Sequence, residues 1–174
     1  IERCYALRAT SDSLRAVWAT PLGALSAGAR AVRELAQRFE HRLPATATQD
    51  EVEALLAALN IDEAVDGILL QLPLPGHLDE QRAVATIDPD KDVDGLTPVS
   101  AGRLALGIPG MVPCTPYGCM KMLESIGYDL RGKHAVVIGR SNIVGKPMAL
   151  MLLQKNATVT ICHSATRDLK AQTL

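Results

Sequence analysis

The stretch from Ala135 to Pro147, AVVIGRSNIVGKP, constrains the fold of this chain more than any other. Its first four residues are all apolar, which predicts a short buried parallel strand because no polar face is left for water. Gly139 ends this strand, and Gly145 allows the next helix to pack closely on it. Since Ala157 to Cys162 is typical of a second strand, the predicted unit is strand, glycine loop, helix, strand. This is the first half of a dinucleotide-binding fold.

The spacing of the two glycines is not specific by itself. The usual G-x-G-x-x-G is absent, and any strand-to-helix turn of an α/β protein would show the same pattern. A tight turn at Gly139 lets backbone N–H groups approach an anion, and the positive end of the next helix would face a phosphate.

The end of the second strand favours a nucleotide. An NAD site commonly has an acid there, whereas this chain has His163, Ser164 and Arg167. Together with Arg140 in the loop, these groups suit the 2′-phosphate of NADP.

The composition indicates a soluble globular protein whose partner is a small molecule. The chain has 174 residues, of which 48% are hydrophobic and 21% are charged. Its formal net charge of -1 offers no electrostatic footprint for nucleic acid or an anionic membrane surface. No apolar run approaches the roughly 20 residues that a bilayer requires, and no secretion signal opens the chain.

The cysteines and the end of the chain add two expectations. Cys4, Cys114, Cys119 and Cys162 form no C-x-x-C pair, which favours a reducing, cytoplasmic compartment and disfavours a structural zinc site. The chain stops at Leu174, shortly after the second strand of the nucleotide unit. We therefore expect an incomplete NADP-binding domain with an open sheet edge.

Two helices are predicted before the next core strand. Apolar residues recur at helical spacing from Ala29 to Glu40, which predicts an amphipathic helix, and His41 to Leu43 fits a short strand. Thr48 and Glu51 form the pattern of a capping box that opens a second helix ending near Asn60. No pattern and no site is assigned to residues 1–28.

Gln71 is a polar residue at the end of the predicted core strand Val65 to Leu72. The carboxyl end of a buried parallel strand is where α/β folds bind ligands, and the prolines at 73 and 75 hold the following loop extended. The alternative is a glutamine that only hydrogen-bonds to nearby backbone.

An acidic run follows the predicted helix from Asp79 to Ile87. Residues 88–95 (DPDKDVDG) lack the twelfth-position Glu of an EF-hand, so no metal is expected there, and a solvated turn is the simplest interpretation. Asp94, before Gly95, is nevertheless a carboxylate on a tight turn. It is therefore a candidate to face the same crevice as Gln71.

A domain boundary is predicted between residues 112 and 113. After a short helix from Ser100 to Leu106, Thr115 is predicted to be the N-cap of a helix from Pro116 to about Ile126. Within it Tyr117 and Lys121 form the Tyr-x-x-x-Lys of short-chain dehydrogenases. In that family, however, the pair follows the glycine loop, so here we interpret it as part of a helix surface.

Four motifs in order give the chain a family resemblance: QLPLP (residues 71–75), DKDVDG (residues 90–95), PCTP (residues 113–116) and VVIGRSNIVGKP (residues 136–147). With them the chain resembles the bifunctional methylenetetrahydrofolate dehydrogenase/cyclohydrolase family over about residues 29–174. The resemblance implies a two-domain α/β fold. An N-terminal folate-binding domain (residues 1–112) would precede the first part of a Rossmann-type NADP-binding domain (residues 113–174).

The resemblance also implies an activity and its residues. The family oxidises 5,10-methylenetetrahydrofolate with NADP and hydrolyses the methenyl product to 10-formyltetrahydrofolate, as a cytoplasmic homodimer in one-carbon metabolism. It implies that Gln71 assists a catalytic lysine and that Asp94 hydrogen-bonds the pterin ring. The loop residues Gly139, Arg140 and Ser141, with Ser164, would hold NADP.

The chain departs from the family pattern at its start. The family's Tyr-x-x-x-Lys motif would fall near Gly23 and Ala27, but the chain contains no lysine before Lys91. We interpret residues 1 to about 28 as an out-of-frame reading or a divergent replacement. Hydrolysis requires a group that moves protons, and the resemblance implies that this group is the lysine of that motif. The sequence therefore predicts an impaired enzyme or, alternatively, an inactive nucleotide-binding or dimerising fragment.

Overall fold

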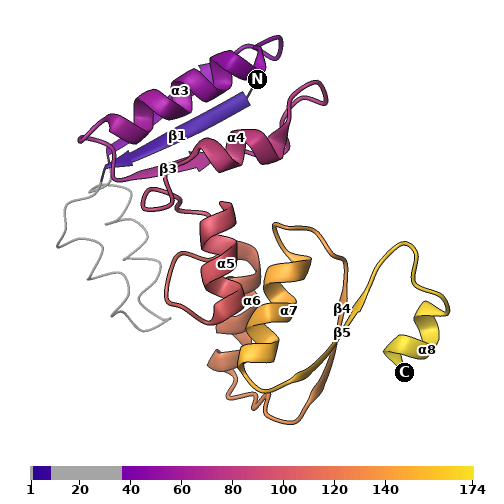
Figure 1. The fold of residues 1–174 in the computed structure, drawn as a ribbon. Helices are drawn as coiled ribbons and strands as arrows, with labels where there is room; N and C mark the ends of the chain where they lie inside the picture. Colours follow the sequence, from indigo (N-terminus) through magenta and orange to yellow (C-terminus); the bar gives the residue numbers. More distant parts are fainter. Residues whose placement is uncertain (1, 9–36) are drawn as a thin grey trace. The chain divides into compact units, whose positions relative to one another are not determined.

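The computed structural model describes residues 2–8 and 37–174, which divide into two compact units (Figure 1). Unit 1 comprises Ile1–Val93 and unit 2 comprises Asp94–Leu174. The domain boundary predicted from the sequence lies later, after residue 112. The helix predicted from Ser100 to Leu106 would therefore fall in the first domain, whereas in the structure it belongs to unit 2.

Unit 1 contains a three-stranded sheet. Its strands are β1 (Glu2–Arg8), β2 (Gln37–Leu43) and β3 (Gly67–Leu70), in the order β2-β1-β3. The central strand β1 pairs antiparallel with both neighbours, so that Tyr5 lies opposite Glu40 on one side and Leu69 on the other.

Two expectations about this sheet are wrong. Gln37 to Glu40 belong to strand β2 and not to a helix, because pairing with β1 outweighs the local helical periodicity. The rest of that predicted helix lies outside the described residues, as do the positions near Gly23 and Ala27. β3 was expected to be parallel, but it is antiparallel to β1 and has a parallel bridge at Ile68 and Asp92 alone within the described residues.

Helices α3 (Gln49–Ile61) and α4 (Glu80–Thr86) contact each other, and α3 also packs on β3. The capping box predicted for α3 is confirmed, since Thr48 and Glu51 bond reciprocally through side chain and backbone. The core between these elements is mostly apolar, although Asp92, which bridges to Ile68, is also buried. Its apolar residues are Val52, Leu56, Leu59, Val65, Ile68, Leu70, Ala83, Val84 and Ile87.

The turn after α4 is fastened to the end of α3 by side chains. Asn60 donates to the Thr86 carbonyl (2.7 Å) and accepts from the Asp88 N–H (2.9 Å). Lys91 Nζ donates to the carbonyls of Leu59 (3.1 Å) and Asp62 (2.8 Å), which neutralises the negative end of the helix. The acidic run is therefore a tightly fixed turn.

Unit 2 is built around helix α7 (Gly145–Gln154), which contacts every other long element of the unit. Those elements are α5 (Pro98–Leu106), α6 (Cys114–Ser125), β4 (His134–Ile138) and β5 (Thr158–Cys162), with the short α8 (Leu169–Thr173) at the end. β4 and β5 are parallel, as predicted. The core contains Leu104, Met120, Met151, Leu152 and Ala157.

Two details of unit 2 differ from the sequence-based expectation. α6 begins at Cys114 with Pro113 as N-cap, because the Tyr117 N–H already bonds to the Pro113 carbonyl (3.2 Å). Thr115 is therefore inside the helix. β4 is only partly buried, and its last residue, Ile138, is 66% exposed, because β5 is the one strand that β4 pairs with in the described part of the chain.

We predict that replacing Gly145 with alanine destabilises unit 2, because an added Cβ would overlap the backbone of Gly139 and Arg140. Such overpacking costs about 1–3 kcal/mol of unfolding free energy. Gly118→Ala is the matched control: Gly118 is inside α6 with nothing near its Cβ position, and the substitution should stabilise by about 0.5–1 kcal/mol. Thermal unfolding measures both, and equal effects would contradict the close approach.

Candidate functional site

The loops after β4 and β5 leave the sheet at the same edge. The N–H of Gly139, the residue after β4, donates to the carbonyl of Cys162, the last residue of β5 (2.8 Å). Gly139 has a φ of 129°, which an L side chain rarely adopts and glycine tolerates. The loop that starts with Arg140 and Ser141 therefore leaves the sheet beside the loop that starts with His163 and Ser164, as the sequence predicts for parallel strands.

Ser141 organises the loop between β4 and α7. Its Oγ accepts from the N–H groups of Val144 (3.1 Å) and Gly145 (3.3 Å), and its carbonyl accepts from the Lys146 N–H (3.0 Å). Pro147 has no N–H. The N–H groups expected to meet a phosphate at the start of α7 are thus used inside the loop, which leaves the helix dipole and side chains to attract an anion.

A compact turn follows β5. The His163 N–H donates to Thr166 Oγ1 (2.8 Å), the Thr166 N–H donates back to the His163 carbonyl (2.8 Å), and His163 Nδ1 accepts from the Ala165 N–H (3.2 Å). Ser164 lies at the outside of this turn and is exposed. Its hydroxyl is therefore presented to solvent by a fixed backbone.

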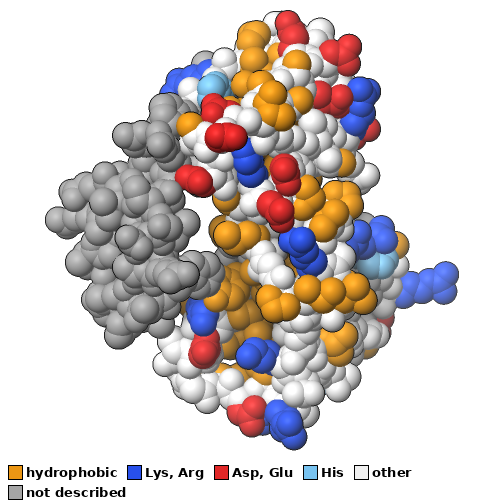
Figure 2. Space-filling model, turned by 60° about the vertical axis from the view of Figure 1, so that its left-hand side comes forward, with side chains coloured by type: hydrophobic (Ala, Val, Ile, Leu, Met, Phe, Trp, Pro, Cys, Tyr) orange, Lys and Arg blue, Asp and Glu red, His pale blue; other side chains and the backbone are white. Residues whose placement is uncertain are grey.

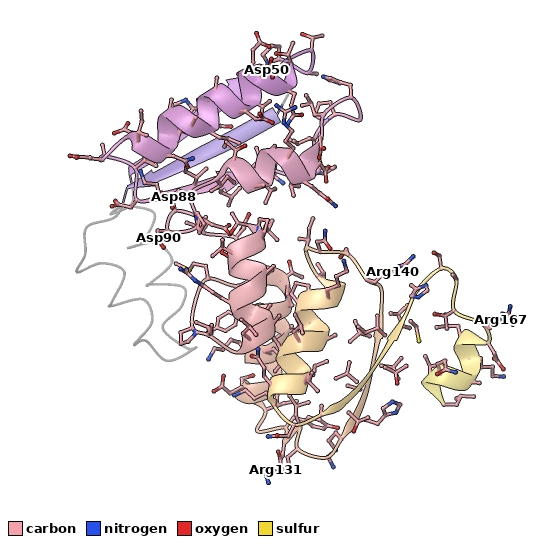
Figure 3. The ribbon with its side chains drawn as sticks, viewed as in Figure 1. Asp50, Asp88, Asp90, Arg131, Arg140 and Arg167 are labelled. Atoms are coloured by element: carbon pink, nitrogen blue, oxygen red, sulfur yellow. The ribbon has the colours of Figure 1, made fainter. Side chains whose placement is uncertain are left out.

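Arg140 and Arg167 supply the positive charge of this region. Figure 3 shows Arg140 at the end of β4, on the loop to α7, and Arg167 on the segment between β5 and α8. Both side chains are exposed, and neither has an ion pair with the described residues. Arg140, Ser164 and Arg167 are thus open to solvent, and side chains of these types suit a phosphate group.

Gln71 belongs to unit 1 and follows β3 directly. Its side chain is exposed, and Nε2 donates to the neighbouring Leu72 carbonyl (2.9 Å). This is the local backbone bond that the sequence left open as an alternative. The side-chain Oε1 carries no hydrogen bond in the described part of the chain. The first lysine of the chain, Lys91, is bound to two carbonyls of α3 and is not available to Gln71.

Asp94 is the first residue of unit 2, and its carboxylate faces Cys114. The Cys114 thiol donates to Asp94 Oδ1 over 3.9 Å. Burial raises the pKa of the Cys114 thiol above its ordinary value, and the nearby Asp94 charge raises it further. Sequence reasoning did not single out Cys114, although its place in the PCTP motif was the available signal.

The turn that carries Asp94 is set by glycine. Gly95 has a φ of 64°, and its missing side chain lets the backbone of Met111 and Val112 pass directly over it. Any Cβ there would overlap the Met111 carbonyl group. The close approach brings the segment before α6 to Asp94, which is why Cys114 reaches the carboxylate.

Lys121 lies on the exposed surface of α6, as interpreted from the sequence, whereas Tyr117 is half-buried and packs against the core of unit 2. Lys121 Nζ is 5.5 Å from the centre of the Tyr117 ring and pairs with Glu124 at 2.7 Å. The hydrogen bond to Glu124 and the tyrosine raise the pKa of Lys121. The amine of Lys121 is thus paired with Glu124, three residues further along the same helix.

The described residues give few signs of other ligand classes. No three of their His, Cys, Asp or Glu side chains are grouped to hold a metal ion. None of the described helices has the length and apolar content needed to cross a bilayer. On the face drawn in Figure 2, acidic and basic side chains are interspersed among apolar ones and do not form one basic patch.

Two domain families match the chain. Residues 27–94 match the catalytic domain of tetrahydrofolate dehydrogenase/cyclohydrolase, and residues 113–174 match the NAD(P)-binding domain of the same enzymes. The first match begins at residue 27, next to the position where the sequence pattern of the family fails.

Relatives agree with these matches. The bifunctional protein FolD of Sphingopyxis alaskensis is 78% identical over 76% of this chain and 44% of its own length. That of Polaromonas naphthalenivorans is 71% identical over 76% of this chain and 47% of its own length. The chain thus spans about half the length of the curated relatives it matches.

Solved structures extend the likeness to the fold. The bifunctional enzyme FolD from Campylobacter jejuni has a TM-score of 0.78 and 43% identity, covering 94% of this chain and 56% of that one. FolD from Trypanosoma brucei, solved with NADP cofactor and an inhibitor, has a TM-score of 0.69 and 37% identity, covering 90% of this chain and 51% of that one. Motifs, domain matches and fold together show that this chain belongs to the tetrahydrofolate dehydrogenase/cyclohydrolase family.

Proposed function

We propose that this chain carries the site for oxidation of 5,10-methylenetetrahydrofolate by NADP. The observation that supports it most is the bond from Gly139 to Cys162, which joins the two loops that carry Arg140 and Ser164. Its relatives are named bifunctional FolD proteins, and one related structure is described as holding NADP.

Arg140 and Ser164 bind the 2′-phosphate of NADP in this proposal. Gly139 and Ser141 shape the loop, because Ser141 folds it around its own hydroxyl and carbonyl. The arginine contributes two charge-assisted hydrogen bonds and the serine a third. NADP supplies the hydride acceptor when it is bound.

Asp94 and Gln71 act on the folate. The Asp94 carboxylate accepts hydrogen bonds from the pteridine N–H groups, and it is held ready by the turn at Gly95. The hydride leaves a carbon between two nitrogens, which share the resulting positive charge. The protein therefore needs to orient the ring and exclude water more than to transfer protons.

Hydrolysis of the methenyl product is expected to be impaired. Addition of water to the methenyl carbon releases a proton, and the family assigns its transfer to a lysine assisted by the glutamine at position 71. This chain contains no lysine before Lys91, and the amine of Lys91 is bound to the end of α3. Gln71 thus lacks the group that it would assist.

The second candidate is an inactive nucleotide-binding or dimerising fragment of the same family, which the missing lysine favours. Under either proposal we expect a cytoplasmic homodimer, by analogy with the family. The two candidates share the NADP site and differ in whether hydride transfer occurs.

We predict that the chain reduces NADP when 5,10-methylenetetrahydrofolate is added, and that the methenyl product accumulates. The absorbances of NADPH and of the methenyl cation follow the two species. Asp94→Ala should lower the rate by about 10-fold or more, because a charged hydrogen bond to the pteridine is lost. NADP binding without any hydride transfer would overturn the proposed activity and support the inactive fragment.

We also predict that Arg140→Ala weakens NADP binding by about 10–100-fold, the cost of a charge-assisted hydrogen-bonded pair, and leaves NAD binding unchanged. Calorimetric titration with each nucleotide measures this. Arg131→Ala is the matched control, since Arg131 is an exposed arginine on the turn before β4 (Figure 3). An equal loss of NAD and NADP affinity would show that Arg140 does not recognise the 2′-phosphate.

A third prediction concerns the charge of Asp94. Asp94→Asn should lower the pKa of the Cys114 thiol, because a neutral amide no longer opposes thiolate formation beside it. The pH profile of Cys114 alkylation, followed by peptide mass spectrometry, should then move to lower pH. The profile of Cys119 in the same digest is the control and should stay in place. An unmoved Cys114 profile would mean that the carboxylate does not face the thiol.

A further inference from the structure

The loop after β3 is held first at the Leu74 N–H and, further along, by His77 Nε2, which bonds to the Ala47 carbonyl (2.9 Å). In the run Pro73-Leu74-Pro75 only Leu74 has an N–H, since proline has none. This N–H donates to Glu80 Oε1 at 2.8 Å, and the Leu74 side chain is buried, with 7% exposed. Glu80 thus satisfies the part-buried N–H of Leu74, and neither neighbouring proline has an N–H that could take its place.

Glu80 is itself fixed, because it is the first residue of α4. The helix is capped by Asp79, whose side chain accepts from the Arg82 N–H (3.0 Å). Gln49, at the start of α3, holds the backbone of Asp79 on both sides: Oε1 accepts from the Asp79 N–H (2.8 Å) and Nε2 donates to its carbonyl (3.3 Å). The start of α4 is therefore tied to α3.

Gln71 lies between two anchored points of the chain. Leu70, the end of β3, precedes it and is buried, and Leu74 follows three residues later. Pro73 fixes one of the torsions between them. Within the described residues, the segment from Gln71 to Pro73 has no anchor of its own except the bond from Gln71 to the Leu72 carbonyl.

We propose that Glu80 is a positioning residue for Gln71: its bond to the Leu74 N–H sets where the loop presents the glutamine amide to the folate. This proposal rests on the proposed function. Glu80 does not touch the substrate; it acts through the loop backbone. Without the carboxylate, the Leu74 N–H would lose its partner and the loop would move to reach water.

The test compares Glu80→Ala with Glu80→Gln in the full chain. The amide oxygen of glutamine can still accept from the Leu74 N–H, so this variant separates the hydrogen bond from the charge. We expect Glu80→Ala to weaken tetrahydrofolate binding by about 5-fold, the usual effect of one lost hydrogen bond, and Glu80→Gln to stay within about 2-fold of the parent. Calorimetric titration measures the affinity.

The matched control is Glu51→Ala. Glu51 is also a first-turn glutamate that accepts a backbone N–H, that of Thr48 at 2.8 Å, but at the start of α3. It should lose stability in thermal unfolding without losing folate affinity. If Glu51→Ala weakens folate binding as much as Glu80→Ala, the effect is one of general stability and the proposal is wrong.

A second readout needs no folate. In the free protein, the NMR signals of the Gln71 side-chain amide should shift in Glu80→Ala and return to the parent positions in Glu80→Gln. The hydrogen exchange of the Leu74 amide should become faster in Glu80→Ala and return to the parent rate in Glu80→Gln. Faster Leu74 exchange with unchanged Gln71 signals would overturn the proposal. If the parent chain binds no tetrahydrofolate, the proposed function fails, and the Gln71 signals still decide whether Glu80 positions the glutamine.

Discussion

The close approach of Gly145 to the backbone of Gly139 and Arg140 is the constraint on which unit 2 depends. It lets α7 start directly against the end of β4, and the Gly139 N–H bond to Cys162 then brings the loop after β5 to the same edge. Because the loop uses its own N–H groups on Ser141, its outward chemistry is left to side chains. The proposed recognition of a phosphate by Arg140 and Ser164 therefore rests on side chains, because these backbone donors are already used inside the loop.

Unit 1 fixes its loops by a different device, namely long polar side chains that bond to backbone groups of another element. Asn60 and Lys91 join the acidic turn to the end of α3, and Gln49 and Glu80 join the start of α4 to α3 and to the loop after β3. These bonds give loop residues the hydrogen-bond partners that strand residues find in a sheet, and the one from Leu74 to Glu80 lies three residues after Gln71. Gln71 is thus carried by a segment whose two ends are anchored, at β3 and at Leu74, whereas Asp94 belongs to unit 2 and is held by the turn at Gly95.

Features of the fold that depend on residues close together in the sequence could be predicted, and features that depend on distant residues could not. The predicted capping box of α3 is confirmed, because the motif consists of Thr48 and Glu51 alone. The predicted parallel pair of β4 and β5 is also confirmed, because glycines mark the turn between strand and helix. Strand β2 was mistaken in part for a helix because its pairing with β1 is distant in sequence. The roles of Ser141 and Glu80 were not predictable, since a hydroxyl or carboxylate in a loop does not reveal which N–H it will meet. The candidate residues themselves came from motifs, and their roles stay proposals.

The most direct test of the account is a comparison of backbone amide NMR shifts on saturation with NADP and with NAD. The account predicts that both nucleotides perturb residues 139–146 and 163–167, and that the differences between the two nucleotides concentrate at Arg140, Ser141 and Ser164. Perturbations confined to other parts of the chain, or identical shifts with both nucleotides at those three residues, would contradict it.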